Sequence, residues 1–308
     1  MDLLRDEKVL ITGPAGRIAF GLARSLAAGN EVWGIARFAD PAAREKVEAL
    51  GVQTRRVDVA TGSFGDLPTD FTYVLHLAAD FSAADYEQSM RVNAEGTGFV
   101  LEHCRRAKAA LVMSTLTVYK PHPDPWHPFR EDEAVGDQQL PAQLPYSVSK
   151  IAEEAVARYC ARSFGLPVTI ARMGAAYGEQ GGLPAWHMEA IAAGEPLRVR
   201  WDPLPYSPIH DDDIAAQLEP LLAVASVPAT VVNWCGDDAV SVQDWAGYFA
   251  GLLGVEAKVE VEPVPGASLG SVGDPTRRAS ITGPCRVGWR DGFRRLVHQS
   301  YPDRVKGA

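Results

Sequence analysis

Short apolar runs alternate with amphipathic stretches along the first half of the chain. Lys8–Thr12 is a buried-strand pattern, and Ile18, Leu22 and Leu26 then recur along one side of a helical pattern that continues to Ala28. The same alternation predicts strands at Val32–Ala36, Val52–Val57, Tyr73–Ala79, Leu111–Thr115 and Pro167–Ala171, and helices at Pro41–Leu50, Ala84–Ala107 and Tyr146–Arg162. Such alternation predicts an α/β fold with a doubly wound parallel sheet.

From Gly178 the pattern is interrupted more often by glycine and proline. Helices are expected at Pro184–Ala193, Asp211–Ala225 and Arg290–Ser300, and strands at Leu197–Arg200, Val231–Trp234 and Glu256–Glu262. Ser241 is a good N-cap for a further helix that runs to Leu253 and ends at Gly254. We therefore divide the chain into residues 1–178, with the main sheet, and residues 179–308, a smaller lobe from which some segments return to that sheet.

Composition argues against several kinds of partner. The formal net charge of −9 and the pI near 5.3 argue against a nucleic-acid or anionic-membrane surface. Met1–Lys8 is too short and too charged for a signal peptide, and no run reaches 18 apolar residues. The four cysteines are scattered without a C-x-x-C, which predicts reduced core thiols of a cytoplasmic protein rather than a disulfide frame or a metal site.

A glycine turn follows the first strand directly. In Gly13-Pro14-Ala15-Gly16, Gly13 can supply the tight turn, and Gly16 lets backbone N–H groups approach a pyrophosphate at the positive end of the next helix. Ala19 provides the third small position, for close packing of helix against strand. An ordinary strand–helix turn is the alternative, but the strand–turn–helix context favours a Rossmann-type dinucleotide-binding domain over residues 1–178.

The ends of the next strands bear on the choice of cofactor. Arg37 stands where NAD-binding proteins commonly place a carboxylate, and a guanidinium pairs with a 2′-phosphate, so we expect NADP(H) to be preferred. NAD(H) stays possible, because Asp40 lies close by. Asp58 follows the third strand and can accept a hydrogen bond from the adenine amino group. His76 lies within an apolar run and is expected to be a hydrogen-bonded core histidine rather than a catalyst.

Tyr146 and Lys150 form a Y-x-x-x-K at the start of an amphipathic helix. Residues four apart share one helix face, so the phenol and the ammonium point to the same place. A cation there lowers the pKa of a phenol, which otherwise lies near ~10. A stretch with six prolines between Pro121 and Pro145 precedes the tyrosine, and we expect it to be a surface loop and a candidate wall or lid of an active site.

Seven motifs in order and spacing carry a family resemblance. They are Thr12–Ile18 (TGPAGRI), His76–Ala79 (HLAA), Asn93–Thr97 (NAEGT), Ser114–Tyr119 (STLTVY), Tyr146–Lys150 (YSVSK), Arg172–Gly178 (RMGAAYG) and Ile209–Asp213 (IHDDD). As a set they resemble an extended short-chain dehydrogenase/reductase of the NAD(P)-dependent epimerase/dehydratase group, over nearly the whole chain.

The resemblance implies a hydroxyl–tyrosine–lysine centre. Tyr146 matches the general acid/base, Lys150 would bind the nicotinamide ribose and depress the pKa of the tyrosine, and Thr115 or its neighbour Ser114 would orient the reacting oxygen. Residues 179–308 would cover the substrate, and the helices Ala84–Ala107 and Tyr146–Arg162 would pair in a four-helix-bundle homodimer. Cofactor contacts are expected from Gly13, Ala15, Gly16, Arg17, Ile18, Arg37, Asp58, Val59, Leu77, Ala78, Ala79, Tyr146, Lys150, Met173 and Ala176.

Two departures from the family pattern bear on the substrate. Ala175 stands where nucleotide-sugar enzymes usually carry an asparagine, and Tyr206 where they tend to carry a phosphate-gripping arginine. We therefore expect an oxidoreductase that prefers NADP(H) and acts on a carbonyl or alcohol of a small, non-nucleotide substrate. One alternative is a nucleotide-sugar epimerase or dehydratase with tightly held NAD, in which Arg198, Arg200 or Arg277 would replace the missing contacts to the pyrophosphate. The other is a non-catalytic dinucleotide-binding redox sensor.

Overall fold

The computed structural model describes residues 4–81, 85–137 and 144–304 of the chain. Contacts within it divide the chain into two compact units. Unit 1 consists of residues 1–118, 142–172 and 215–232, and unit 2 of residues 119–141, 173–214 and 233–308. The start of the helix predicted at Ala84 and residues 138–143 of the predicted proline-rich loop lie outside the described residues.

Unit 1 is built on a seven-stranded sheet in the order β13-β7-β5-β4-β1-β2-β3. The register pairs of β1 with β2 and β4, of β2 with β3, and of β4 with β5 are all parallel. The doubly wound sheet predicted from the alternation is therefore confirmed. The strands are β1 (Lys8–Thr12), β2 (Glu31–Ala36), β3 (Gln53–Arg56), β4 (Tyr73–His76), β5 (Ala109–Thr115), β7 (Val168–Met173) and β13 (Thr230–Trp234), the last residues of β7 and β13 belonging to unit 2.

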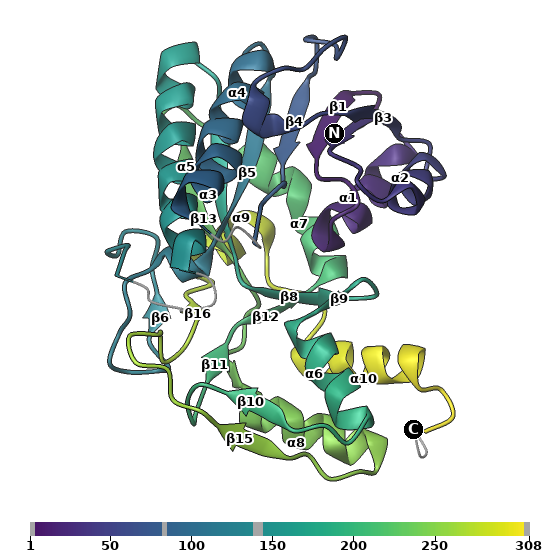
Figure 1. The fold of residues 1–308 in the computed structure, drawn as a ribbon, viewed down its shortest axis with the longest axis vertical. Helices are drawn as coiled ribbons and strands as arrows, with labels where there is room; N and C mark the ends of the chain where they lie inside the picture. Colours follow the sequence, from purple (N-terminus) through teal and green to yellow (C-terminus); the bar gives the residue numbers. More distant parts are fainter. Residues whose placement is uncertain (1–3, 82–84, 138–143, 305–308) are drawn as a thin grey trace. The chain divides into compact units, whose positions relative to one another are not determined.

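Helices pack on this sheet through apolar side chains at helical spacing. In α1 (Arg17–Ala27) the buried residues Ala19, Leu22, Ala23 and Leu26 form one stripe. A core cluster joins side chains of β1, β4 and β5 to α4 (Gly96–His103) and α5 (Leu144–Phe164), which lie side by side in Figure 1. The other helical segments are α2 (Pro41–Glu48), η1 (Val59–Thr61), α3 (Tyr86–Ser89), η2 (Met90–Glu95), η3 (Leu116–Val118) and α7 (Asp211–Ala223), whose first residues belong to unit 2.

Unit 2 is made of short strands and helices around an aromatic core. Trp245, Phe249 and Phe293 stack or meet edge to edge at its centre. The helices are α6 (Leu183–Ala192), α8 (Val242–Leu253), α9 (Thr276–Thr282) and α10 (Trp289–Ser300). The strands are β6 (Pro128–Phe129), β8 (Ala175–Gly178), β9 (Gly181–Gly182), β10 (Leu197–Val199), β11 (Pro205–Tyr206), β12 (Pro208–His210), β14 (Val240–Ser241), β15 (Val259–Val261) and β16 (Val272–Gly273).

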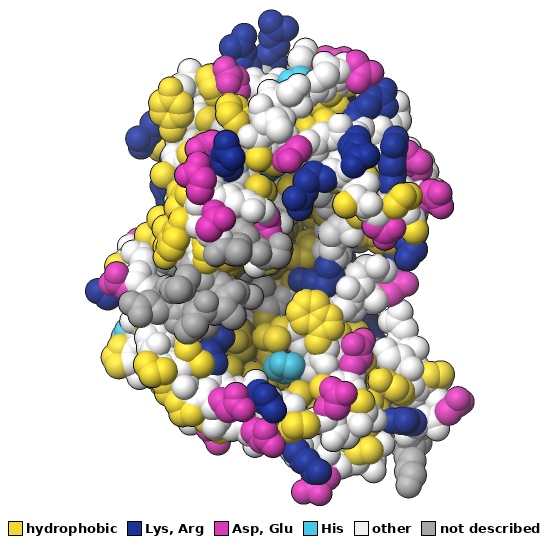
Figure 2. Space-filling model, viewed as in Figure 1, with side chains coloured by type: hydrophobic (Ala, Val, Ile, Leu, Met, Phe, Trp, Pro, Cys, Tyr) yellow, Lys and Arg dark blue, Asp and Glu magenta, His cyan; other side chains and the backbone are white. Residues whose placement is uncertain are grey.

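Two predicted segments differ in the structure. The single helix expected over Ala84–Ala107 contains a π-helical turn, η2, between α3 and α4. The proline-rich stretch includes a short strand, β6, which pairs with β16. Among the described residues no helix is long and apolar enough to cross a membrane. On the face shown in Figure 2, acidic and basic side chains are interspersed.

Candidate active site

A cavity of about 480 Å³ opens in unit 1 at the carboxyl ends of β1, β2 and β4. The β1–α1 turn forms part of it: Gly13 has φ +65°, and a Cβ added there would lie 3.1 Å from Ala78 Cα. A Cβ on Gly16 would lie 3.1 Å from the Gly13 carbonyl oxygen. Gly16 is the N-cap of α1 and has no side chain that could cap the helix. The N–H groups at this N-terminus carry the positive end of the helix dipole, which suits a pyrophosphate.

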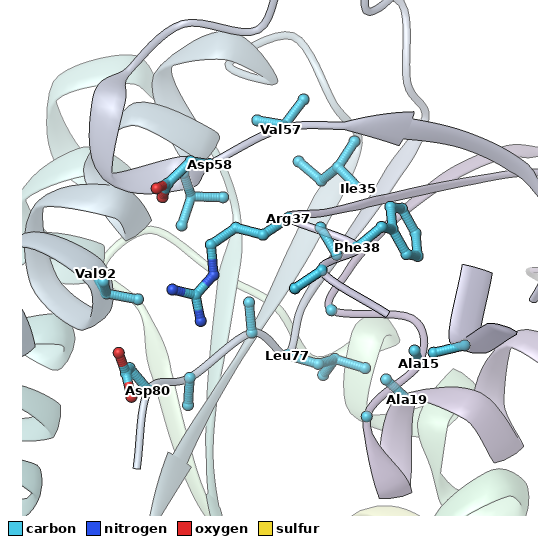
Figure 3. A pocket seen from close by; sticks show the side chains of 18 of the residues that line it. Ala15, Ala19, Ile35, Arg37, Phe38, Val57, Asp58, Leu77, Asp80 and Val92 are labelled. Carbon is cyan, nitrogen blue, oxygen red and sulfur yellow. The ribbon is translucent and has the colours of Figure 1, made fainter. Parts of the chain in front are cut away.

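Charged groups line the opposite end of the cavity. Figure 3 shows Arg37, which follows β2, extending between Asp58 and Asp80. The Asp58 carboxylate also accepts a hydrogen bond from Ala60 N at 3.1 Å, which fixes its position. The small residues Ala78 and Ala79 leave room over the end of β4, as predicted. Glycine turn, small floor and mixed charges fit a dinucleotide.

Tyr146 lies in the first turn of α5, beside the end of β5. Its phenol shares a hydrogen bond with the Thr115 hydroxyl. Its ring stacks on Phe81, with centroids 4.7 Å apart, and Phe81 lines the cavity. A hydroxyl, a phenol and the cavity wall are thus brought together.

Ser114, the second hydroxyl candidate, has a different partner. Its buried hydroxyl donates to Glu154 Oε1 at 2.7 Å. The same carboxylate accepts two hydrogen bonds from Arg172, each of 2.8 Å, in a buried bidentate pair. Ser114 therefore belongs to the contact that ties α5 to β7, whereas Thr115 faces Tyr146.

Lys150 is almost fully buried behind the cavity wall. Its Nζ donates a hydrogen bond of 2.6 Å to the carbonyl oxygen of Met113, a residue that lines the cavity. It also forms an ion pair with Glu153, one turn further along α5. Both partners are buried, with 1% and 0% of their surface exposed.

The direction of the pKa shift at Tyr146 differs from the expectation. The pKa of the phenol is raised, first because the group is buried and second because the Glu153 carboxylate repels the tyrosinate, while the Thr115 hydrogen bond lowers it. Burial also raises the pKa of Glu153 to about 7, against the opposing effect of Lys150. Because Glu153 forms an ion pair with Lys150, its carboxylate compensates the charge of the ammonium beside the phenol.

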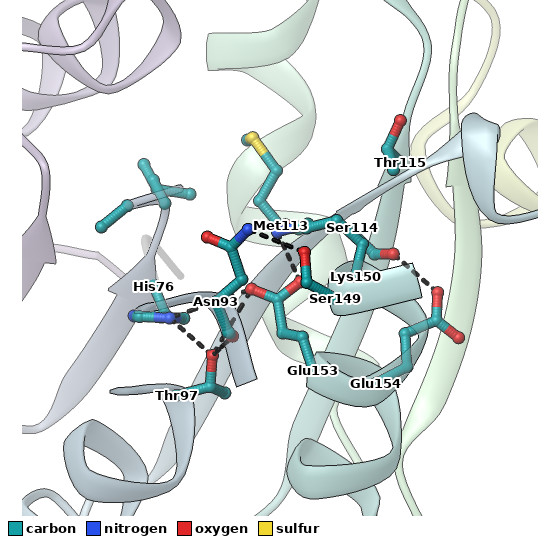
Figure 4. Close-up of polar contacts among 12 residues, drawn as sticks. His76, Asn93, Thr97, Met113, Ser114, Thr115, Ser149, Lys150, Glu153 and Glu154 are labelled. Carbon is teal, nitrogen blue, oxygen red and sulfur yellow. Dashed lines mark hydrogen bonds and ion pairs between the residues drawn. The ribbon is translucent and has the colours of Figure 1, made fainter. Parts of the chain in front are cut away.

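His76 is a buried core histidine, as predicted. Thr12 Oγ1 accepts hydrogen bonds from Leu77 N and Ala78 N, and so its own proton is directed to His76 Nδ1 at 3.0 Å. His76 Nε2 then donates to Thr97 Oγ1 at 2.8 Å (Figure 4), and the Thr97 hydroxyl donates to the Asn93 carbonyl oxygen. Burial lowers the pKa of His76 to about 3, which agrees with a neutral ring.

The structure brings most of the predicted cofactor residues to the cavity. These are Gly13, Ala15, Gly16, Arg17, Ile18, Arg37, Asp58, Val59, Leu77, Ala78 and Ala79. Met173 and Ala176 belong to unit 2. Further lining residues, among them Phe38, Asp80, Phe81 and Val92, were not predicted from the sequence. Of these, Asp80 and Phe81 follow the end of β4, a position that the rule for parallel sheets indicates.

The comparisons agree with this geometry. A model of the NAD dependent epimerase/dehydratase family matches residues 9–201. No curated protein matches the chain. Among solved structures, UDP-glucose 4-epimerase from Thermus thermophilus in complex with NAD has 25% identity and a TM-score of 0.78, with coverage of 97% of this chain and 100% of that one.

Two further structures show the same fold. UDP-glucuronic acid 4-epimerase from Bacillus cereus, with UDP-glucuronic acid and NAD, has 22% identity and a TM-score of 0.81, covering 96% of this chain and 100% of that chain. A dTDP-glucose 4,6-dehydratase from Streptomyces venezuelae, with NAD bound, has 22% identity and a TM-score of 0.81, covering 96% and 98%.

Proposed function

Since the chain belongs to the NAD-dependent epimerase/dehydratase family, we propose that it oxidises and re-reduces an alcohol carbon of a nucleotide sugar. It is an enzyme of that family and uses a nicotinamide dinucleotide. The observation that carries the proposal is the hydrogen bond between Thr115 and Tyr146 beside the dinucleotide cavity. The Thermus epimerase, similar over its full length, supports the substrate class.

The cavity residues fit the cofactor. Gly13, Gly16 and the N-terminus of α1 would hold its pyrophosphate, and Asp58 its adenine. When bound, the nicotinamide supplies the hydride acceptor and donor that the protein lacks.

The side chains around Tyr146 have separate tasks. The Tyr146 phenol exchanges a proton with the substrate oxygen, and the Thr115 hydroxyl orients that oxygen and stabilises its developing charge. Lys150, fixed by the Met113 carbonyl and paired with Glu153, holds its ammonium group behind the phenol. Because both the phenol and the ammonium are on α5, one helix sets their spacing.

A second candidate function is the reduction of a small carbonyl compound that carries no nucleotide. Ala175 and Tyr206 favour it, because alanine has no polar side-chain group and tyrosine lacks the positive charge of the arginine expected at its position. Arg200 favours the nucleotide sugar instead. Its guanidinium donates to Tyr206 Oη at 3.3 Å, and its buried Nε has no hydrogen-bond partner among the described residues. Arg200 is thus available to pair with a diphosphate.

Ligand binding and product analysis test the proposal. We expect UDP-glucose, UDP-glucuronic acid or dTDP-glucose to raise the melting temperature of the purified protein, and to yield an epimer or a dehydrated product. Tyr146→Phe should abolish turnover and leave cofactor binding nearly unchanged. Tyr159→Phe, at an exposed tyrosine of the same helix, is the control and should be fully active. Turnover by Tyr146→Phe would refute the mechanism, and turnover of simple carbonyls alone would favour the second candidate.

For the cofactor we propose a preference for NADP(H), supported by Arg37 in the cavity. Arg37→Ala should weaken NADP(H) binding about tenfold or more, the value of one charged hydrogen bond, and leave NAD(H) binding unchanged. Arg56→Ala, at an exposed position of β3 outside the cavity, is the matched control. Tighter binding of NAD(H) than NADP(H) by the unmodified protein would contradict the preference, and the NAD bound in the related structures makes this a sharp test.

We also propose a homodimer in which α4 and α5 pair with the same helices of a second copy. Val148 and Tyr159 on α5 are exposed, at 39% and 66%, and share a face with the half-buried Ile151. The cytoplasmic location stays a prediction, supported by four free cysteines, three of which are buried.

A further inference from the structure

Glu153 is a buried carboxylate for which the proposed chemistry has no task. It lies in α5 between the catalytic pair and Glu154, and none of its surface is exposed. Its neighbour Glu154 has a full set of partners in Arg172 and Ser114. Glu153 instead forms an ion pair with Lys150, and its other oxygen lies 3.4 Å from Thr97 Oγ1 and 3.9 Å from His76 Nε2.

Among the described residues, Lys150 is the one cationic side chain that contacts Glu153. On its own helix the titratable groups that face it are Lys150, Tyr146 and Glu154. On β4 it faces His76, which is neutral because its Nδ1 accepts the proton of Thr12. The charged side chains of η2 and α4, such as Arg91, Glu95 and Glu102, are exposed. The charge beside Tyr146 is therefore set by Lys150 and Glu153 together.

We propose that Glu153 is a positioning residue that acts as a proton-linked counter-ion of Lys150. As a carboxylate it cancels the ammonium, so that the net charge beside the Tyr146 phenol is zero. As a carboxylic acid it leaves the ammonium uncompensated, and the net charge is plus one. The step is a simple ionisation, in which the proton of the Glu153 carboxyl group passes to solvent and returns.

The buried geometry gives this ionisation a large effect. Two opposite charges in contact away from water interact more strongly than at a surface, so that loss of either changes the field at a nearby phenol. The pKa of Glu153, raised to about 7, places the change at neutral pH. Protonation should then favour the tyrosinate, which accepts the proton of an alcohol, and ionisation should favour the phenol, which donates to a carbonyl oxygen.

An experiment without substrate separates this inference from the proposed function, on which it rests. With ¹³C in the side-chain carboxyl carbon of glutamate and the ζ carbon of tyrosine, we expect one glutamate signal to titrate near pH 7. We expect the Tyr146 signal, assigned by its loss in Tyr146→Phe, to shift over the same range. In Glu153→Gln both transitions should disappear, whereas Glu95→Gln, at an exposed position of η2, should retain them.

Two more variants distinguish a charge effect from a packing effect. Glu153→Asp keeps the carboxylate, and the Tyr146 signal should still show a transition. Glu153→Met, neutral and of similar length, gives the same comparison if Glu153→Gln does not fold. A Tyr146 signal that is flat across pH 5–9 in the unmodified protein, or one unchanged in Glu153→Gln, would overturn the inference. Neither result depends on whether a nucleotide sugar is the substrate.

Discussion

His76 shows how a titratable side chain can be buried with both ring nitrogens satisfied and take no part in chemistry. It receives a proton from Thr12 and donates one to Thr97, so the neutral ring fits and the imidazolium does not. The residue was predicted as a core histidine because it lies in an apolar strand. Its two threonine partners come from elements far apart in the sequence, and no local pattern indicates them.

The depressed pKa of His76 makes stability depend on pH. Between about pH 6.5 and pH 3 the unfolded chain binds this proton and the folded chain does not. The contribution of the neutral His76 ring to the free energy of unfolding is therefore complete above pH 6.5. It is lost as the pH falls, by about 1.4 kcal/mol per pH unit. In urea titrations from pH 7 to pH 4.5, we expect His76→Gln to lose less stability on acidification than the unmodified protein. His298→Gln, at an exposed position, should lose as much as the unmodified protein.

At the scale of elements, the glycine turn between β1 and α1 combines two constraints. Gly13 has a positive φ and lies against Ala78, where a side chain would meet backbone. Gly51 also has a positive φ, of +88°, but nothing lies within 4 Å of a Cβ added to it. A comparison of alanine substitutions at the two glycines therefore distinguishes the cost of backbone strain from the effect of a side chain that crowds Ala78.

We expect Gly51→Ala to destabilise the protein by about 1–2 kcal/mol, the cost of left-handed backbone for alanine, and Gly13→Ala to destabilise it more, because its Cβ would also crowd the backbone of Ala78. Only Gly13→Ala should also weaken dinucleotide binding, by about tenfold or more, because it crowds the cavity floor. Thermal denaturation and cofactor titration measure the two effects. Equal cofactor affinity in both variants would mean that the turn does not contact the dinucleotide.

Elements with regular apolar spacing were predicted closely. β1 has its predicted bounds, and Ser241 caps α8 by accepting a hydrogen bond from Asp244 N, as expected from its position. The π-helical turn η2 was missed, because it accompanies hydrogen bonds of Asn93 to the backbone of Asp80 and to Ser149, which are distant in sequence. Glu153 was missed for a similar reason: a helical pattern does not show that a carboxylate faces the buried Lys150.

At the scale of the whole molecule, the sequence indicated the family, and the family model matches residues 9–201. The fold is shared over 95% or more of the chain with nucleotide-sugar enzymes of low identity. Fold similarity at this level does not determine the substrate, because one fold can carry different sites. The residues that bear on the substrate, Ala175 and Tyr206, lie in short strands of unit 2, where the apolar pattern of the sequence does not predict the structure closely.

The proposed dimer is tested at this scale. Tyr159→Glu places a charge on the exposed face of α5, and we expect light scattering to show a dimer for the unmodified protein and a monomer for the variant. Glu45→Gln, at an exposed position of α2 and outside both helices of the bundle, should leave the dimer intact. A monomer before any substitution would contradict the predicted bundle.

Helix α5 carries Tyr146, Lys150, Glu153 and Glu154, and successive residues of a helix are turned by about 100°. Insertion of a single residue between Tyr146 and Glu154 would rotate the ion pair with Arg172 out of phase with the catalytic pair. The length of α5 between Tyr146 and Glu154 is therefore fixed by two contacts at once, the catalytic pair and the ion pair with Arg172.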